Sequence, residues 1–299
     1  MKKETIEKNK VVLLVDDDDD DRLLLSDALT GLIEHIAIIE MASGREVLSF
    51  LLSEENPRII PDLILLDMNM PELNGLEILR KIKEDQNLRQ IPIVMLSTAS
   101  DRDLIAQAYQ TGVNAFMVKP ITGFEYEMVA SAVNICFLNN LAAGHLDDVF
   151  KSQKSSNIVV IEDNDDHWNL LNFSMRQSMP RVNLIRLRDK PAAMEFFESS
   201  LKQVDSLPDM ILLDLYLPTR EAGFALLEHI RYRIEINKFP SIPIIVLSYS
   251  DSRDDVKASY ARQANSYMVK PVDPDNWPVY FKHLTHFWSK TISLPKRNH

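Results

Sequence analysis

The sequence has only one cysteine, seven glycines and no long uninterrupted apolar segment. The single Cys136 cannot form an intramolecular disulfide, which fits a reducing compartment. No segment approaches the roughly 18 apolar residues of a membrane-spanning helix. The first ten residues also lack the apolar run of a secretory signal. We therefore expect a soluble, cytoplasmic protein that does not enter a membrane.

Positive charge is scarce in the first half of the chain. Residues 1–150 contain 13 Lys and Arg against 26 Asp and Glu, whereas the remainder contains 20 against 18. Binding to nucleic acid without regard to sequence requires clustered Lys and Arg that face phosphate groups. We therefore expect no nucleic-acid partner. The seven histidines also lack the spacing of a histidine-based metal site.

The most informative feature is a segment that occurs twice, LILLDMNMP at 63–71 and MILLDLYLP at 210–218. In each copy an apolar run leads into a single aspartate, Asp67 or Asp214, and then into a turn that contains proline. A buried apolar strand that ends in a carboxylate presents that group at the carboxyl edge of a parallel sheet. The rest of the sequence can be placed around these two aspartates.

Short apolar runs alternate with segments of helical periodicity on both sides of a polar segment at 142–157. At 299 residues the chain is long enough for about two domains. The alternation predicts an α/β fold, with two doubly wound, five-stranded parallel-sheet domains in tandem. The predicted parts are a first domain at 1–142, a linker at 143–156 and a second domain at 157–299.

The spacing of the motifs supports a duplicated fold. The distance from Ser97 to Lys119 is 22 residues, as is that from Ser248 to Lys270. The second copy has four more residues between its aspartate and its serine, because Asp214 to Ser248 is 34 residues and Asp67 to Ser97 is 30. We expect these extra residues in two loop-like segments, 219–223 and 234–241, because insertions are tolerated best in loops.

Four kinds of polar group are predicted at the carboxyl edge of each sheet. They are an acidic pair after strand one, the single aspartate after strand three, a serine after strand four and a lysine after strand five. Clustered carboxylates repel one another unless a cation lies among them, and oxygen ligands suit Mg²⁺ or Mn²⁺. A carboxylate beside such a cation can attack a phosphoryl group, with hydroxyl and ammonium donors binding the phosphoryl oxygens. The residues are Asp16, Asp17, Asp67, Ser97 and Lys119 in the first copy, and Glu162, Asp163, Asp214, Ser248 and Lys270 in the second.

With these residues in register twice, the chain resembles the receiver (CheY-like) domains of two-component response regulators, which have a flavodoxin-like fold. The resemblance implies that Asp67 and Asp214 accept phosphate from a histidine kinase or a histidine phosphotransfer protein. It also implies Mg²⁺ at Asp17 and Asp67, and at Asp163 and Asp214, with Asp16 and Glu162 acting mainly through water. The further implied features are metal binding by the backbone carbonyls of Asn69 and Tyr216, switch aromatics at Phe116 and Tyr267, and cis Lys119–Pro120 and Lys270–Pro271 bonds.

Some of the same residues also have simpler interpretations. We expect Asp18 to Asp21 to be a solvated charged face at a helix amino end, where acidic residues are favourable. Packing alone could account for Phe116 and Tyr267. In the second copy, Tyr216 replaces Asn69 and Tyr249 replaces Thr98. Our hypothesis is that this bulk hinders water, so that a phosphate on Asp214 outlives one on Asp67.

The leading interpretation is a non-enzymatic signalling protein whose output is protein contact or onward transfer of phosphate. Few residues follow the second predicted fold, so we expect no DNA-binding output domain. One alternative is a scaffold in which one or both receivers are never phosphorylated. Another is a phosphatase of the haloacid dehalogenase type. That family needs a second aspartate two residues after the nucleophile, where this chain has Asn69 and Tyr216.

Overall fold

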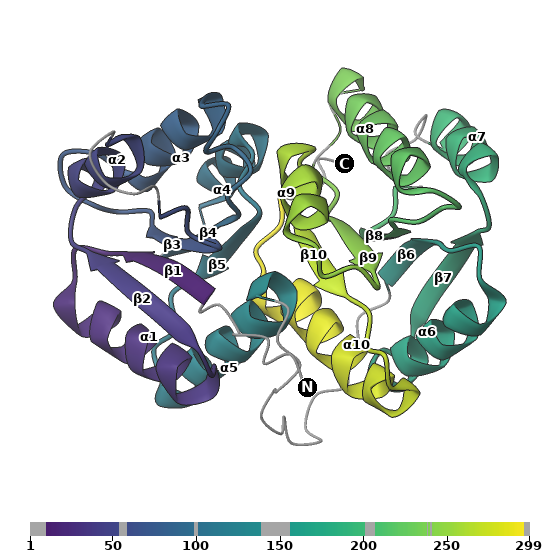
Figure 1. Cartoon of the computed structure of the whole chain (residues 1–299), viewed down its shortest axis with the longest axis horizontal. Helices are drawn as coiled ribbons and strands as arrows, with labels where there is room; N and C mark the ends of the chain where they lie inside the picture. Colours follow the sequence, from purple (N-terminus) through teal and green to yellow (C-terminus); the bar gives the residue numbers. More distant parts are fainter. Residues whose placement is uncertain are drawn as a thin grey trace, which may run out of the picture.

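Two five-stranded parallel sheets follow each other along the chain (Figure 1). The computed structural model describes residues 10–53, 59–98, 101–138, 156–200, 207–237, 239 and 241–295. The strand order is β2-β1-β3-β4-β5 in the first sheet and β10-β9-β8-β6-β7 in the second, which is the same order read from the opposite edge. The predicted fold is confirmed. The strands are β1 (Lys10–Val15), β2 (Ile36–Met41), β3 (Leu63–Asp67), β4 (Ile93–Ser97), β5 (Ala115–Val118), β6 (Ser156–Ile161), β7 (Val182–Leu187), β8 (Met210–Asp214), β9 (Ile244–Ser248) and β10 (Ser266–Val269).

Helices cover both faces of each sheet (Figure 1). In the first domain, α1 (Asp19–Leu32) and α5 (Gly123–Val133) lie on one face, and α2 (Gly44–Leu52), α3 (Gly75–Glu84) and α4 (Arg102–Thr111) lie on the other. In the second domain, α6 (Asp165–Ser178) and α10 (Trp277–His286) lie opposite α7 (Lys190–Ser200), α8 (Arg220–Ile236) and α9 (Arg253–Ala261). Short helices η1 (Asn134–Leu138), η3 (Pro274–Asn276) and η4 (Phe287–Thr291) complete the described elements. In the described part of the chain, no helix has both the length and the apolar character that crossing a membrane requires.

The two central strands β3 and β8 are buried along their whole length, which explains their continuous apolar sequence. A glycine follows each strand where the next helix approaches the strand end. A Cβ atom on Gly75 would lie 2.4 Å from the Asp67 carbonyl oxygen, and one on Gly223 would lie 1.9 Å from that of Leu215. Only glycine therefore allows α3 and α8 to pack this closely behind the aspartates.

The prediction that the extra residues of the second copy lie in loops was wrong for most of them. Helix α8 has 17 residues, whereas α3 has 10, and α8 begins immediately after its N-cap residue Thr219. The buried side chains of Leu227, Ile230 and Ile234 continue the apolar stripe of α8 at intervals of three and four residues. The added sequence keeps the helical period, so it extends the helix instead of enlarging a loop.

The two domains meet beside the edge strands β5 and β10, where η1 packs against β10 and α5 packs against α10 (Figure 1). Two asparagines at equivalent positions bond across this interface. The Asn114 side-chain amide donates to the Ala264 carbonyl oxygen at 2.9 Å, and the Asn265 amide donates to the Asn114 carbonyl oxygen at 3.0 Å. Each side-chain oxygen in turn accepts the backbone N–H of the neighbouring strand, from Ile93 or Ile244. The pair therefore joins both sheets and both domains.

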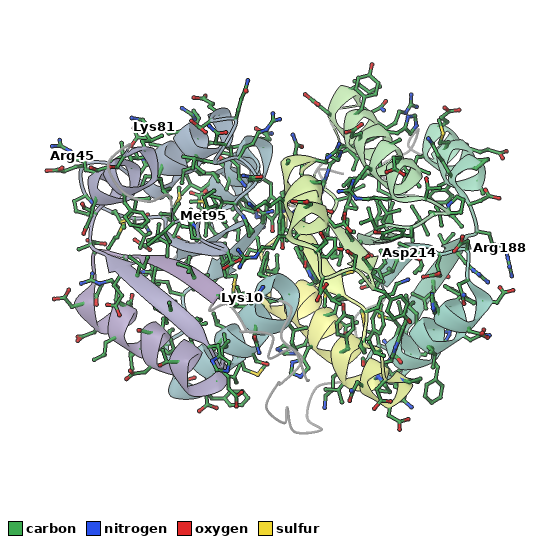
Figure 2. The ribbon with its side chains drawn as sticks, viewed as in Figure 1. Lys10, Arg45, Lys81, Met95, Arg188 and Asp214 are labelled. Carbon is green, nitrogen blue, oxygen red and sulfur yellow. The ribbon has the colours of Figure 1, made fainter. Side chains whose placement is uncertain are left out.

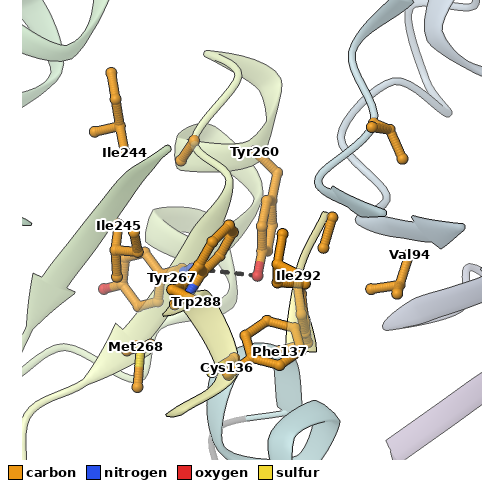
Figure 3. Packing of buried hydrophobic residues seen from close by; sticks show 14 of the residues in the cluster. Val94, Cys136, Phe137, Ile244, Ile245, Tyr260, Tyr267, Met268, Trp288 and Ile292 are labelled. Atoms are coloured by element: carbon orange, nitrogen blue, oxygen red, sulfur yellow. Dashed lines mark hydrogen bonds between the residues drawn. The ribbon is translucent and has the colours of Figure 1, made fainter. Parts of the chain in front are cut away.

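Apolar packing and the C-terminal segment complete this interface (Figure 3). The Phe137 ring meets the Phe287 ring edge to face at a centroid distance of 5.9 Å, and the Ser266 hydroxyl donates to the backbone carbonyl oxygen of Cys136. Ile292 forms an antiparallel bridge with Met117 of β5. The C-terminal segment thus covers the backbone of a strand that would otherwise be an open sheet edge.

The predicted domain boundaries are not tested by the fold. Strand β6 begins at Ser156, the last residue of the predicted linker, and most of the linker lies outside the described residues.

Replacing Asn265 with Ala should lower the free energy of unfolding by about 1–3 kcal/mol, because buried groups in both domains lose their hydrogen-bond partners. Urea unfolding monitored by circular dichroism measures this change. The matched control is Asn183→Ala, whose amide bonds Asn157 at an exposed position. Equal effects of the two substitutions would contradict the role assigned to Asn265.

Candidate functional site

The carboxyl edge of the first sheet brings together the residues that the sequence predicted. Asp16 follows β1, Asp67 ends β3, Ser97 ends β4 and Lys119 follows β5. Parallel pairing in register places the ends of these strands side by side. Strands β1 and β3 neighbour each other where the strand order reverses, which is the usual ligand-binding position of an open α/β sheet.

The Lys119 ammonium group lies among three carboxylates. Its Nζ atom is 2.7 Å from Asp16 Oδ2, 2.9 Å from Asp21 Oδ2 and 3.1 Å from Asp67 Oδ1. Asp16 and Asp67 are each only 2 % exposed. Tyr126 of α5 also donates its hydroxyl to Asp21, at 3.0 Å. The lysine is therefore held at the centre of the site from several directions.

Burial controls the charge state of this cluster. It raises the pKa of Asp16 and of Asp67, since ionised carboxylates lose hydration there, and Lys119 opposes both shifts. Burial alone would lower the pKa of Lys119, but its bonds to Asp16, Asp21 and Asp67 outweigh this and raise it. Lys119 therefore stays protonated, whereas ionisation of Asp16 and Asp67 remains less favourable than in water.

The first site fits a divalent cation. Oxygen atoms of Asp16, Asp17 and Asp67 all lie within 4.8 Å of one another. Asp67 Oδ1 is buried, and the contact given for it is the Lys119 ammonium group at 3.1 Å. The backbone N–H of Asn69 donates to the other oxygen, Oδ2, at 2.9 Å. Carboxylate oxygens with free acceptor capacity are the ligands that Mg²⁺ and Mn²⁺ require.

The second site repeats the lysine but not every acidic residue. Lys270 Nζ is 2.7 Å from Glu162 Oε2 and 2.9 Å from Asp214 Oδ2, and Lys270 is 1 % exposed. Figure 2 labels Asp214 in the interior of the second domain. Burial raises the pKa of Asp214, Lys270 opposes the shift and Glu162 adds to it. Ser248, at the end of β9, is fully buried.

Tyr216 and Asp163, both predicted metal ligands of the second site, are placed differently in the structure. The Tyr216 N–H donates to Asp214 Oδ1 at 3.2 Å, as Asn69 does for Asp67. Asp163 is exposed. Among the described residues, the group at this edge whose ligand atoms lie within 4.8 Å of one another is Glu162, His167 and Asp214. Metal binding by Asp163, and by the carbonyl oxygens of Asn69 and Tyr216, stays a prediction.

Sequence reasoning missed Asp21 and His167, which occupy the same position in the two copies. The interpretation of Asp18 to Asp21 as a solvated face holds for Asp18, which caps α1, but was wrong for Asp21. Both residues lie in the first turn of the helix that follows the acidic pair. Their position in the first helical turn was the available signal. A helix that starts at the end of a strand places its first turn beside the carboxyl edge of the sheet, where the site lies.

Aromatic side chains border the second site. The Tyr249 hydroxyl lies 3.2 Å from His167 Nε2, and the Tyr249 ring lies 5.5 Å from Lys270 Nζ. The Trp277 ring stacks against His167 at a centroid distance of 6.1 Å. The Tyr216 hydroxyl donates to Asp255 at 3.2 Å. These contacts fix two tyrosines in the second site, at positions where the first copy has Asn69 and Thr98.

The expected switch aromatics are both buried. Phe116 is fully enclosed, and the Tyr267 hydroxyl donates to the Ser250 carbonyl oxygen at 2.7 Å, in the loop after β9. The expectation of cis Lys-Pro bonds was wrong. Neither Lys119–Pro120 nor Lys270–Pro271 is cis, and among the described residues the one cis peptide is Leu217–Pro218.

A family model described as "Response regulator receiver domain" matches residues 12–129 and again residues 158–279. The chain is 38 % identical over 139 residues to the response regulator Rcp1 of Synechocystis, which covers 46 % of this chain and 92 % of that protein. It is 36 % identical over 83 residues to the probable methanogenesis regulatory protein FilR2 of Methanothrix harundinacea, covering 27 % of this chain and about half (54 %) of that relative. A solved structure titled as the Mn²⁺-bound form of Rcp1 has 33 % identity and a TM-score of 0.38, and covers 42 % of this chain and 91 % of its own.

Replacing Asp67 with Asn should stabilise the metal-free protein at neutral pH. Because folding raises the pKa of Asp67 from its ordinary value of 3.8, the carboxyl group favours the folded state below that value. This contribution is lost as the pH rises through the folded-state pKa, so ionised Asp67 opposes folding at pH 7. The amide cannot ionise, and Lys119 keeps its bonds to Asp16 and Asp21.

Thermal unfolding with chelator, at a series of pH values, checks this expectation. The variant should melt above the wild type at pH 7, and the difference should shrink as the pH approaches 3.8. Asp27→Asn changes an exposed carboxylate and serves as the control, with an effect of about 0.5 kcal/mol or less. A lower melting temperature for Asp67→Asn at pH 7 would overturn this reasoning.

Proposed function

Because the chain belongs to the response regulator receiver domain family and contains two such domains, we propose that it carries signals by accepting phosphoryl groups on Asp67 and Asp214. The donor is a histidine kinase or a histidine phosphotransfer protein. The observation that carries this proposal is the lysine at each acceptor, fully buried at Lys270 and largely buried at Lys119. Lys119 contacts Asp67 and Lys270 contacts Asp214, although the surrounding residues differ.

The transfer step uses the chain's own residues at each acceptor. A carboxylate oxygen of Asp67 forms the new bond to phosphorus while the bond between phosphorus and the donor imidazole nitrogen breaks. The bonding electron pair returns to that nitrogen. Lys119 and Ser97 are suited to donate to the phosphoryl oxygens, since the ammonium group is already beside the acceptor. A Mg²⁺ or Mn²⁺ ion at Asp16, Asp17 and Asp67 would neutralise the charge that gathers there.

Intact-mass spectrometry after incubation with acetyl phosphate and Mg²⁺ tests this proposal on the full chain. The wild type should gain two phosphoryl groups, Asp67→Asn and Asp214→Asn one each, and the double variant none. A single gain that is lost only in Asp67→Asn would leave the second receiver as a docking module. No gain, together with no Mg²⁺ binding, would favour the scaffold alternative.

We also infer that output occurs through protein contacts. Ile121 and Val272 follow the lysine and proline of their own domain, and these side chains are 87 % and 89 % exposed. Large apolar side chains that are exposed at the same place in both copies, close to the acceptor, suit transient protein docking. The elements β5 and α5, between which Lys119 lies in the chain, pack against the second domain. A change at Asp67 is therefore well situated to influence the second receiver.

The phosphate on Asp214 should outlive the phosphate on Asp67. The hydroxyl groups of Tyr216 and Tyr249 are held by bonds to Asp255 and His167, and we expect the bulk of the two rings to hinder the approach of water to Asp214. Full-length Asp67→Asn and Asp214→Asn, each phosphorylated on its remaining aspartate, allow the two half-lives to be compared by mass spectrometry. Adding Tyr216→Asn and Tyr249→Thr to the Asp67→Asn chain should shorten the longer half-life severalfold. Equal half-lives of the two single variants would refute this hypothesis.

A further inference from the structure

The two receivers differ at one position beside the acceptor, and the difference changes the chemistry of the ligands. Asp21 in the first domain and His167 in the second domain occupy the same place in the first helical turn after the acidic pair. Asp21 bonds Lys119, whereas His167 faces the glutamate of its own acidic pair. The first site therefore presents only oxygen ligands, and the second also presents an imidazole nitrogen.

We propose that His167 is a metal ligand in the second receiver, where Glu162, His167 and Asp214 form a mixed nitrogen and oxygen site for a divalent transition-metal ion such as Mn²⁺. The first receiver keeps an all-oxygen site suited to Mg²⁺. This inference rests on the proposed function only in assuming a metal ion at the acceptor. It extends that proposal by assigning different metal preferences to the two sites.

The distances suit a shared coordination shell. Ligand atoms of Glu162, His167 and Asp214 all lie within 4.8 Å of one another. His167 Nδ1 is 3.3 Å from Glu162 Oε1, close to the spacing of about 3 Å between neighbouring ligands when each is about 2.1 Å from a metal.

The lysine does not block this site, because it uses other oxygen atoms. Lys270 contacts Glu162 through Oε2, whereas His167 faces Oε1 of the same carboxylate. On Asp214, Lys270 contacts Oδ2, and Oδ1 accepts the Tyr216 N–H and retains a further lone pair. An ion beside His167 can thus bind Glu162 and Asp214 while both remain paired with Lys270.

The neighbours of His167 orient its ring as outer-shell partners of a ligand do. With Nδ1 on the metal, Nε2 carries the proton and donates to the Tyr249 hydroxyl, which lies 3.2 Å away. The Trp277 ring stacks on the imidazole with an interplanar angle of 29°. A hydrogen bond to the distal nitrogen fixes both the tautomer and the ring orientation of a metal-bound histidine. Tyr249 therefore has a positioning role here.

The identity of the metal follows from the ligand types. Mg²⁺ takes oxygen ligands and keeps several waters, whereas imidazole favours transition metals. Replacing a carboxylate by an imidazole also removes one negative charge from the site, which weakens the attraction for Mg²⁺. Both effects lower the affinity of the second receiver for Mg²⁺ relative to that of the first receiver.

Pulsed electron paramagnetic resonance of Mn²⁺ bound to the full chain tests the inference directly. A ¹⁴N coupling from imidazole is expected in the wild type and in Asp67→Asn, and it should disappear in His167→Asp and His167→Gln. In equilibrium dialysis of Asp67→Asn, adding His167→Asp should lower the preference for Mn²⁺ over Mg²⁺ by on the order of tenfold. Circular dichroism verifies that each variant is folded.

The first site supplies a matched gain-of-function variant. Asp21→His in an Asp214→Asn background should create a ¹⁴N coupling at a site that has none. Mn²⁺ that binds at both wild-type sites without nitrogen coupling would overturn the role of His167 and leave the proposed phosphoacceptor function intact. No Mn²⁺ at the second site would overturn both this inference and metal-dependent phosphorylation of Asp214.

Discussion

The structure of each site depends on one buried ammonium group among carboxylates. Burying several carboxylates at one sheet edge is unfavourable, because they lose hydration and repel one another. Lys119 reduces that cost by contacting Asp67 and Asp16 at once, and Lys270 does so by contacting Asp214 and Glu162. Each lysine leaves part of the negative charge uncompensated, and a site with excess negative charge and available oxygen atoms attracts a cation. The same arrangement keeps an ammonium group beside a carboxylate oxygen of Asp67 and of Asp214.

The interface between the domains connects the two sites to a common framework. Each sheet ends at this interface in the strand that precedes the site lysine, β5 or β10. Asn114 and Asn265 hold these ends together and also bond the adjacent strands β4 and β9. A displacement of Lys119 or Lys270 toward a phosphorylated aspartate would therefore pull on strands that the other domain contacts. The tandem arrangement makes each receiver part of the environment of the other.

Much of the site could be predicted from sequence. Its residues come at the ends of predicted strands, and the same order of strands and polar residues occurs twice in the chain. Asp67, Ser97 and Lys119 were found in this way, and so were their counterparts in the second copy. Asp21 and His167 were missed, since their role depends on the direction in which the first helical turn faces. The extra residues before β9 were assigned to loops because the spacing does not show that Ile230 and Ile234 stay buried on one helix face.

The sequence by itself determined the number of domains, the parallel sheets and the aspartates at the ends of their central strands. Apolar runs that end in polar residues have one favourable arrangement in a parallel sheet, with their carboxyl ends at a common edge. Only the tertiary structure decided which carboxylates contact each lysine and that His167 faces Glu162. It also decided that the receivers pack through β10 on η1, α10 on α5 and the C-terminal segment on β5. These features depend on side-chain direction and on contacts between residues far apart in the chain. Neither is encoded in the local pattern of a single segment.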